Sequence, residues 1–304
     1  MKVILARPRG FCAGVVRAIE MVERSIEIYG TPVYVLHEIV HNRHVVEDLK
    51  GKGAQFVETL DEVKLGAVTL FSAHGVSTAV VEQAKSRNLK SIDATCPLVM
   101  KVHLQAQQYS RQGFEIIIIG HSGHPEVEGT RGCVEGLSHV VSNSNEVASL
   151  KVKNPDRLVY VTQTTLSTDD TQGVIEALKK RFVIQGPELS DICYATQSRQ
   201  NAVRQLAKEV DLLLVVGSGT SSNSNRLREV GEKNGLSSYL IENADDLNPS
   251  WFSERIRVGV TAGTSAPETM VQKVIEKLRV YGASTVSEME GAHETVHFRL
   301  PKSL

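Results

Sequence analysis

Three cysteines occupy the same kind of position in three successive parts of the chain. Cys12, Cys96 and Cys193 each follow a short apolar run and a polar turn, and each stands before a stretch typical of an amphipathic helix. Pro97, directly after Cys96, is typical of the first turn of a helix. Because the N–H groups and peptide dipoles at a helix N-terminus favour negative charge, we expect each thiol to be biased toward the thiolate that binds metals. The pattern predicts one metal centre held by three parts of the chain.

Short apolar runs of strand type recur along the chain, with helical patterns between them. The runs are Val33–Leu36, Val68–Phe71, Ile116–Ile119, Val159–Val161, Leu212–Val216 and Val258–Val260, and two of the helical patterns are Thr78–Arg87 and Val271–Leu278. Alternation of this kind is typical of parallel sheets built from βα units. The first run after each of the three cysteines begins 21, 20 and 19 residues later, which indicates an internal threefold repeat.

We therefore predict an α/β fold of three similar domains in a pseudo-threefold arrangement, and a length of 304 residues suits two or three domains. The expected boundaries are 13–96, 97–192 and 193–281, followed by a C-terminal tail, 282–304. In this tail the alternation of Val296, Phe298 and Leu300 predicts a terminal strand.

Charge and cysteine content narrow the classes of protein that fit. With a formal net charge of −1 there is no overall field to attract nucleic acid or an anionic membrane, and no apolar stretch approaches the length of a membrane span. We expect no nucleic-acid or membrane partner and a soluble, cytoplasmic protein. Four cysteines without an export signal argue for reduced thiols that serve a metal or catalysis, rather than for disulfides.

The number of cysteines bears on the kind of metal centre. Taken singly, each cysteine would be typical of a buried core residue. A structural zinc site normally has four ligands, often in C-x-x-C pairs, and an electron-transfer [4Fe–4S] cluster takes four cysteines. Three widely spaced thiolates fit better a cluster with one iron left open for substrate. Cys133, in T-R-G-C-V-E-G, is neither preceded by an apolar run of strand type nor followed by a helical pattern. We therefore expect Cys133 to be structural.

The loop after each apolar run is rich in polar residues. The loops read H-E-I-V-H, S-A-H-G, G-H-S-G-H-P-E, T-Q-T-T, G-S-G-T-S-S-N-S-N and T-A-G-T-S-A-P. Open α/β sheets bind ligands beyond the carboxyl ends of their strands, so six such loops can enclose a small pocket.

Histidines and hydroxyl-rich turns in these loops suggest an anion site. His41, His74 and His124 come from three different loops and can donate hydrogen bonds to phosphate, with His37, His44 and His121 as their nearest competitors. A zinc site formed by His37 and His41 remains an alternative.

The serine-rich loop Ser218–Asn225 precedes a helical stretch that starts near Arg226, so it can cradle an anion, although a flexible Gly/Ser connection would read the same way. Ser265 lies in a second hydroxyl-rich turn, Thr261–Pro267. Because the chain lacks the G-x-x-x-x-G-K-[ST] sequence of an NTPase loop, these donors suit a diphosphate better than a triphosphate with magnesium.

Glu126 is the best candidate for proton transfer, since its loop also supplies a histidine. If Glu126 lies in an enclosed pocket, burial raises its pKa and lets it hold a proton at neutral pH. Thr164 is expected to relay that proton or to bind a substrate hydroxyl.

Many of these motifs, in this order, resemble one enzyme family. The matching pieces are R-G-F-C-A-G-V, H-E-I-V-H-N, S-A-H-G, D-A-T-C-P, G-H-x-x-H-P-E, T-Q-T-T-L-S, I-C-Y-A-T, S-S-N-S-N-R and T-A-G-x-S-A-P, spread from about Lys2 to Lys302. The chain is similar to the 4-hydroxy-3-methylbut-2-enyl diphosphate reductases of the non-mevalonate isoprenoid pathway.

The resemblance implies a trefoil of three α/β domains around a [4Fe–4S] cluster with one open iron, held by Cys12, Cys96 and Cys193. It further implies an allylic diphosphate substrate that is reduced, with loss of its hydroxyl group, to isopentenyl and dimethylallyl diphosphate. The resemblance also implies that the diphosphate is bound by His41, His74, Ser221, Ser222, Asn223 and Ser265. It places His124, Glu126 and Thr164 near the substrate hydroxyl.

Two other functions would also use the three thiolates, and the sequence bears on the source of the electrons. An iron–sulfur hydro-lyase would use the same three thiolates without net reduction, and a non-catalytic iron–sulfur or zinc sensor would bind metal without turnover. The chain has no G-x-G-x-x-G nicotinamide fingerprint, so we expect a separate electron carrier. The family implies one of ferredoxin or flavodoxin type.

Overall fold

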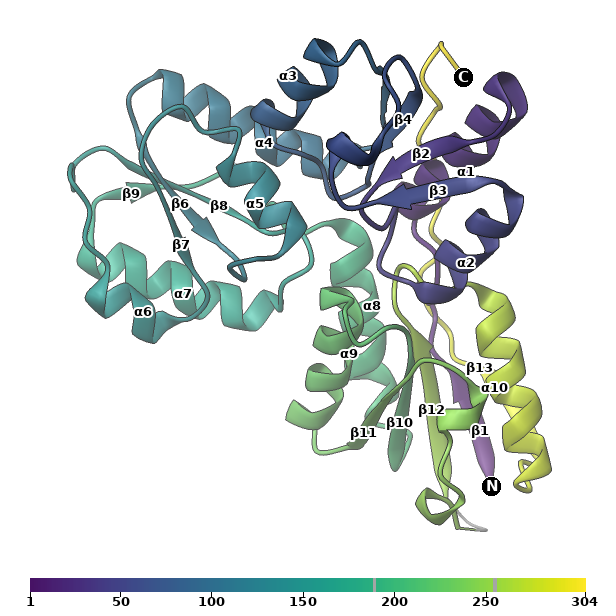
Figure 1. Ribbon diagram of the computed structural model, residues 1–304. Helices are drawn as coiled ribbons and strands as arrows, with labels where there is room; N and C mark the ends of the chain where they lie inside the picture. Colours follow the sequence, from purple (N-terminus) through teal and green to yellow (C-terminus); the bar gives the residue numbers. More distant parts are fainter. Residues whose placement is uncertain (188–189, 254–255) are drawn as a thin grey trace. The chain divides into compact units, whose positions relative to one another are not determined.

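The computed structural model describes residues 1–187, 190–253 and 256–304, and it has the α/β fold that the sequence predicts (Figure 1). Its strands form three sheets in which all the described strand pairs are parallel. The chain divides into two compact units. The first unit comprises Met1–Val15, His41–Val45 and Tyr194–His297, and the second comprises Val16–Val40, Val46–Cys193 and Phe298–Leu304.

One sheet of the second unit has the strand order β3-β2-β4-β5. Its strands are β2 (Val33–Leu36), β3 (Ala54–Val57), β4 (Val68–Phe71) and β5 (Lys90–Asp93), and the helices of this part are α1 (Ala13–Tyr29), α2 (Arg43–Lys52) and α3 (Thr78–Ser86), with a 3₁₀ turn η1 (Leu60–Glu62). Helix α3 begins where Ser77 Oγ accepts a hydrogen bond from the N–H of Val80, which satisfies one of the unpaired donors of the first turn.

The other sheet of the second unit has the order β7-β6-β8-β9. Its strands are β6 (Glu115–Ile119), β7 (Ser138–Val141), β8 (Leu158–Thr162) and β9 (Ile184–Gln185), and its helices are α4 (Pro97–Arg111), α5 (Pro125–Arg131), α6 (Ser144–Ser149) and α7 (Thr168–Arg181). Ile116 and Ile118 pack with residues of α4 and α5, whereas Ile117 and Ile119 pack with residues of α6 and α7. Helices therefore cover both faces, which explains why β6 is buried throughout and apolar from Ile116 to Ile119 (Figure 1).

The sheet of the first unit has the order β11-β10-β12-β1-β13. Its strands are β1 (Lys2–Leu5), β10 (Leu212–Val216), β11 (Ser237–Ile241), β12 (Arg257–Ala262) and β13 (Thr285–Glu288), with helices α8 (Tyr194–Leu206), α9 (Ser222–Lys233) and α10 (Glu268–Val280) and the 3₁₀ turns η2 (Ala244–Asp246) and η3 (Pro249–Trp251). Residues of α10 pack on one face of this sheet and residues of α8 and α9 on the other.

The three sheets share one topology. Each contains three strands that follow one another in the chain, and the second of the three lies at one edge, followed in space by the first and the third: β3-β2-β4, β7-β6-β8 and β11-β10-β12. The fourth place is taken by β5, by β9 and, in the first unit, by β1 from the beginning of the chain. The expectation of three similar α/β parts is therefore confirmed, while the boundaries 13–96, 97–192 and 193–281 stay a prediction.

The predicted strand positions agree with the structure, but the predicted terminal strand is wrong. The segment through Val296, Phe298 and Leu300 has no regular structure, and the strand of the tail is β13, which pairs with β1. Phe298 and Leu300 are half-buried while Arg299 is exposed, so the alternation reflects side-chain burial without strand pairing of the backbone. A strand needs a partner for its N–H and C=O groups, and within the tail β1 provides one for β13.

Helix α9 begins earlier than expected, at Ser222 rather than near Arg226. Ser221 is its N-cap residue, and its Oγ accepts a hydrogen bond from the N–H of Ser224 at 3.3 Å.

None of the helices in the described part of the chain combines the length and the apolar character needed to cross a membrane.

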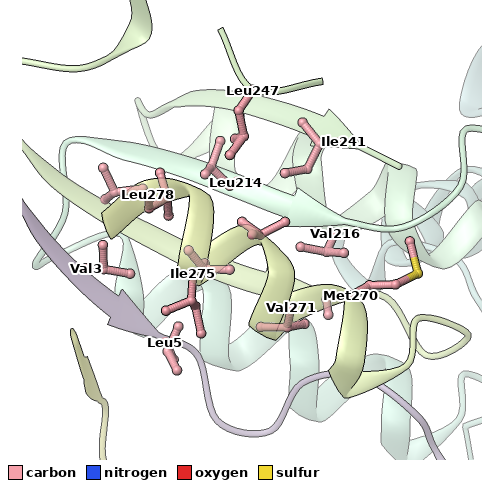
Figure 2. Close-up of a cluster of buried hydrophobic side chains, with 14 of the residues drawn as sticks. Val3, Leu5, Leu214, Val216, Ile241, Leu247, Met270, Val271, Ile275 and Leu278 are labelled. Atoms are coloured by element: carbon pink, nitrogen blue, oxygen red, sulfur yellow. The ribbon is translucent and has the colours of Figure 1, made fainter. Parts of the chain in front are cut away.

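Figure 2 shows a cluster of buried hydrophobic side chains between α10 and the sheet of the first unit. Leu214 of β10 is fully buried there, together with Val260, Val271 and Ile275.

We predict that Leu214→Ala lowers the free energy of unfolding by about 2–5 kcal/mol, because the substitution leaves a cavity in a tightly packed cluster. Denaturant unfolding followed by circular dichroism measures this change. Val280→Ala, at a residue that is 78% exposed, is the control and should change stability by no more than about 0.5 kcal/mol. Equal effects of the two substitutions would contradict the assignment of Leu214 to the core.

Candidate active site

Each of the three cysteines stands immediately before a helix. Cys12 precedes α1, Cys96 is the N-cap residue of α4 and Cys193 precedes α8. All three are partly exposed, and none of the four cysteines of the chain forms a disulfide. The expected position at helix N-termini is therefore found at all three sites.

The backbone N–H of each cysteine makes an equivalent hydrogen bond. Cys96 donates to the carbonyl of Ala73 at 3.0 Å, Cys193 to that of Thr164 at 3.1 Å and Cys12 to that of Thr264 at 3.2 Å. In every case the acceptor lies two residues beyond the third strand of a sheet, β4, β8 or β12. The threefold repeat thus extends from the strands to the cysteine loops.

Burial works against the thiolate form at Cys12. The N–H groups of Val15 and Gly14 and the charge of Arg199 lower the pKa of the Cys12 thiol, but burial outweighs them and leaves this pKa raised. The expected net bias toward thiolate is therefore wrong for Cys12 by itself. Metal binding at this residue has to displace a proton.

Cys133 lies in a different environment. It is buried, and its Sγ is 3.6 Å from Nδ1 of His103 and 3.8 Å from the carbonyl oxygen of Val76. Burial raises the pKa of the Cys133 thiol. These packing contacts agree with the structural role expected for Cys133.

Glu126 is buried and is held by Thr164. Glu126 is only 2% exposed. Its two carboxyl oxygens accept hydrogen bonds from the backbone N–H of Thr164 at 2.6 Å and from Thr164 Oγ1 at 3.0 Å. Burial raises the pKa of Glu126 to about 7, against the opposing effect of the Thr164 hydrogen bonds, and the charge of Asp191 adds to the rise. The carboxyl group can therefore hold a proton near neutral pH.

His124 and His74 lie in the same unit as Glu126. His124 is the N-cap residue of α5, and its Nδ1 accepts a hydrogen bond from the N–H of Glu126 at 3.2 Å. The rings of His74 and His124 meet edge to face with their centroids 5.9 Å apart. The structure thus brings together four of the predicted site residues, His74, His124, Glu126 and Thr164.

Glycine is required next to His74. Gly75 has φ +80°, and a Cβ there would lie 2.5 Å from Cε1 of His103. A Cβ at Gly129 of α5 would likewise come within 3.3 Å of the Gly75 backbone and of His103. The loop of His74 therefore packs directly on the helix that carries Glu126.

The first unit contains a second group of predicted residues. Asn223 is buried; its Oδ1 accepts a hydrogen bond from the N–H of Thr264 at 3.0 Å, while its Nδ2 has no hydrogen-bond partner among the described residues. Ser265 Oγ donates to the carbonyl of His41 at 2.9 Å. With Ser221 and Ser222 these residues surround the N-terminus of α9, where a buried amide donor and the helix dipole both favour an anion.

His37 and His41, the histidines of the alternative zinc site, do not lie on a helix. His37 and His41 lie on an irregular segment between β2 and α2, so they do not share a helix face. His37 Nδ1 lies 3.2 Å from Glu58 Oε2, and the N–H of His121 donates to Gln163 Oε1. Within 1–187, 190–253 and 256–304, no three His, Cys, Asp or Glu side chains lie close enough together to hold a single metal ion.

Sequence analysis missed Arg199 and Glu294. Arg199 is fully buried in α8, and its guanidinium group forms a bidentate ion pair with Glu294, with N–O distances of 2.7 and 2.8 Å. The only signal in the sequence is the position of Arg199 on the buried face of α8, in register with Ala195 and Ala202.

Comparison with known proteins gives the family. Residues 3–279 match the family model described as LytB protein. The chain belongs to the LytB family. It is 56% identical over 306 residues to the 4-hydroxy-3-methylbut-2-enyl diphosphate reductase of Acidithiobacillus ferrooxidans, covering 100% of this chain and 97% of that protein. It is 57% identical over 304 residues to the protein of the same name from Bordetella bronchiseptica, covering 100% and 93%.

Solved structures of reductases are similar to this LytB-family chain. The E-1-hydroxy-2-methyl-but-2-enyl-4-diphosphate reductase from Plasmodium falciparum is 39% identical with a TM-score of 0.95, covering 99% of this chain and 96% of that one. A structure of (E)-4-hydroxy-3-methyl-but-2-enyl diphosphate reductase is 33% identical with a TM-score of 0.66, covering 92% and 100%. The family resemblance drawn from the motifs is confirmed.

We predict that Glu126 makes the stability of this LytB-family protein depend on pH. With a pKa raised from 4.5 to about 7, the folded state binds more protons than the unfolded state between these values, so stability falls as pH rises through this range. Glu126→Gln removes the effect. We expect the free energy of unfolding of the wild type, minus that of Glu126→Gln, to fall by on the order of 3 kcal/mol as the pH rises from about 4.5 to about 8. Urea unfolding across this range measures it, and a pH-independent difference would contradict the raised pKa.

Proposed function

We propose that this protein is an iron–sulfur reductase that converts 4-hydroxy-3-methylbut-2-enyl diphosphate to isopentenyl diphosphate and dimethylallyl diphosphate. Its membership of the LytB family and the printed names of its relatives support this activity. The observation that carries the proposal is the buried carboxyl group of Glu126, with its pKa raised to about 7. Loss of a hydroxyl group as water requires an acid that is still protonated at neutral pH.

Cys12, Cys96 and Cys193 are the proposed ligands of a [4Fe–4S] cluster. Their chemistry fits this group, because three thiolates leave one iron without a protein ligand. Their positions fit as well, since each stands directly before the first turn of a helix, α1, α4 or α8, where the helix dipole favours negative charge. When bound, the cluster supplies two electrons and Lewis acidity toward the substrate hydroxyl.

Glu126 and Thr164 handle the proton in this proposal. In the overall reaction the bond between carbon and the hydroxyl oxygen breaks, two electrons and two protons enter, and water leaves. Glu126 gives one proton to the departing oxygen, and the hydroxyl of Thr164, 3.0 Å from Glu126 Oε2, orients the carboxyl group and binds the substrate hydroxyl. The second proton reaches either end of the allyl system, which accounts for two products, and the substrate's own diphosphate is a possible source of it.

The diphosphate is the proposed ligand of the donors around α9. Asn223 Nδ2, with the hydroxyl groups of Ser221, Ser222 and Ser265, offers neutral donors to phosphate oxygens. His41 and His74 complete the proposed set, and His124 is placed with Glu126 near the substrate hydroxyl. Neutral donors and imidazoles bind the anion without magnesium.

The electrons are proposed to come from a cytoplasmic ferredoxin- or flavodoxin-type protein. The sequence has no nicotinamide fingerprint, so a separate carrier is the simplest source.

The proposed function predicts that Glu126→Gln abolishes turnover and leaves the cluster in place. Glutamine keeps the size of the side chain and its acceptor oxygen but has no acidic proton, so turnover should fall by on the order of 10²–10⁴-fold. The measurement is anaerobic reconstitution with iron and sulfide counting, followed by turnover of the allylic alcohol diphosphate with a strong artificial reductant. Glu128→Gln is the matched control, because Glu128 is an exposed residue of the same helix.

The outcomes separate this function from its rivals. Wild-type turnover that needs no reductant would indicate a hydro-lyase, and a bound cluster without consumption of the diphosphate would indicate a sensor. Normal turnover by the Glu126→Gln variant would remove Glu126 from the mechanism.

We also predict that Asn223→Asp weakens binding of inorganic pyrophosphate. Aspartate keeps the acceptor for the N–H of Thr264 but replaces the buried Nδ2 donor by a negative oxygen. Affinity measured by isothermal titration should fall by about tenfold or more. Asn248→Asp is the control: it makes the same charge change at an exposed residue and keeps an N-cap acceptor for η3. Unchanged affinity of Asn223→Asp would exclude Asn223 from the anion site.

A further inference from the structure

Arg199 of α8 contacts the loop that ends at Cys12. Its Nε and Nη2 donate to the carbonyl of Gly10 at 3.1 and 2.8 Å, and Nη2 also donates to the carbonyl of Phe11 at 3.3 Å. The N–H of Gly10 donates to the carbonyl of Ala262 at the end of β12, and the N–H of Cys12 donates to that of Thr264 in the loop after β12. The backbone before Cys12 is therefore held through its carbonyl groups and through its N–H groups.

Arg17 of α1 makes the same kind of contact with the loop that ends at Cys96. Its Nη1 donates to the carbonyl of Thr95 at 3.1 Å and to that of Ala94 at 3.5 Å. Ala94 and Thr95 stand in the same positions before Cys96 as Gly10 and Phe11 before Cys12. Two of the cysteine loops are thus held by an arginine in an equivalent way.

Lys101 of α4 contacts the loop that ends at Cys193. Its Nζ lies 3.4 Å from the carbonyl oxygen of Ser190 and 3.4 Å from Oδ1 of Asp191. The buried Asp191 in turn accepts a hydrogen bond from the N–H of Thr162 at the end of β8. The ammonium group of a lysine is a compact point charge, so Lys101 pairs with a carboxylate. The guanidinium groups of Arg17 and Arg199 have several N–H donors and each contact two carbonyl groups of a cysteine loop.

The three contacts follow one cyclic rule. Each cation lies in the second turn of the helix that follows one cysteine, and it contacts the loop that ends at another cysteine. Arg17 follows Cys12 and contacts the Cys96 loop, and Lys101 follows Cys96 and contacts the Cys193 loop. Arg199 follows Cys193 and contacts the Cys12 loop, which closes the cycle. We infer that these three cations are positioning residues that hold the cysteine loops in the conformation that binds the cluster. This inference rests on the proposed function.

The part of the C-terminal tail after β13 supports two of these contacts. Glu294 accepts hydrogen bonds from both terminal nitrogens of Arg199 and from Ser198 Oγ, and it neutralises a fully buried charge. The carbonyl of Arg299 accepts a hydrogen bond from Nε of Arg17 at 3.1 Å. The tail is therefore part of the support of the cysteine loops.

Hydrogen exchange of the full-length, iron-free chain tests the rule directly. The variants are Arg17→Gln, Lys101→Gln and the double variant Arg199→Gln/Glu294→Gln, which leaves no buried unpaired charge. Controls on the same helices are Arg24→Gln, Arg111→Gln and Arg204→Gln. Each variant should speed exchange at the next cysteine loop by on the order of tenfold, so that Arg17→Gln loosens the amides of Ala94 and Cys96 but not that of Cys12.

Cluster retention is the second readout. After anaerobic reconstitution, each variant should lose its iron to a chelator about 10–100-fold faster than the wild type and its helix-matched control, the range typical of groups that orient metal ligands. Unchanged exchange in the next loop, or faster exchange without faster iron loss, overturns the inference. A wild type that takes up no iron would defeat the proposed function, whereas the exchange pattern, which needs no iron, would still decide whether the cations hold the loops.

Discussion

The backbone hydrogen bond from each cysteine N–H to the loop beyond a third strand is the constraint on which the rest of this structure depends. Cys12, Cys96 and Cys193 all make it, with acceptors at equivalent positions in three sheets of the same topology. Because the acceptor loop leaves a buried strand and the cysteine enters a helix, the bond fixes each thiol at a junction between two rigid elements. Flexible loops could not hold three distant thiols in reproducible positions.

Desolvation gives the site its chemical character. A carboxyl group on a solvated helix surface would be ionised at neutral pH, but burial of Glu126 raises its pKa to about 7 even though Thr164 donates two hydrogen bonds to it. The same effect raises the pKa of the Cys12 thiol against the helix N–H groups and Arg199. The pKa values of Glu126 and of Cys12 are thus both raised by the water that the surrounding fold excludes.

Much of the fold could be predicted from the sequence, for identifiable reasons. Parallel strands that are covered on both faces are nearly continuous apolar runs, and the run Leu212–Val216 predicts β10 for this reason. A weaker signal failed at Val296, Phe298 and Leu300, where Val296 is exposed and Phe298 and Leu300 are half-buried without strand pairing. Strand pairing is a contact between distant segments, and local alternation does not report it.

The sequence by itself determined the sheet-forming runs, the three cysteine–helix junctions and the polar loops from which the candidate site is drawn. These features depend on neighbouring residues, through apolar runs, helix caps and turns. Only the tertiary structure decided the burial that raises the pKa of Glu126, the Asn223 Nδ2 that has no partner among the described residues, and the ion pair between Arg199 and Glu294, whose partners are 95 residues apart. Burial and long-range hydrogen bonds exist only once the chain has folded, so no local pattern could have revealed them.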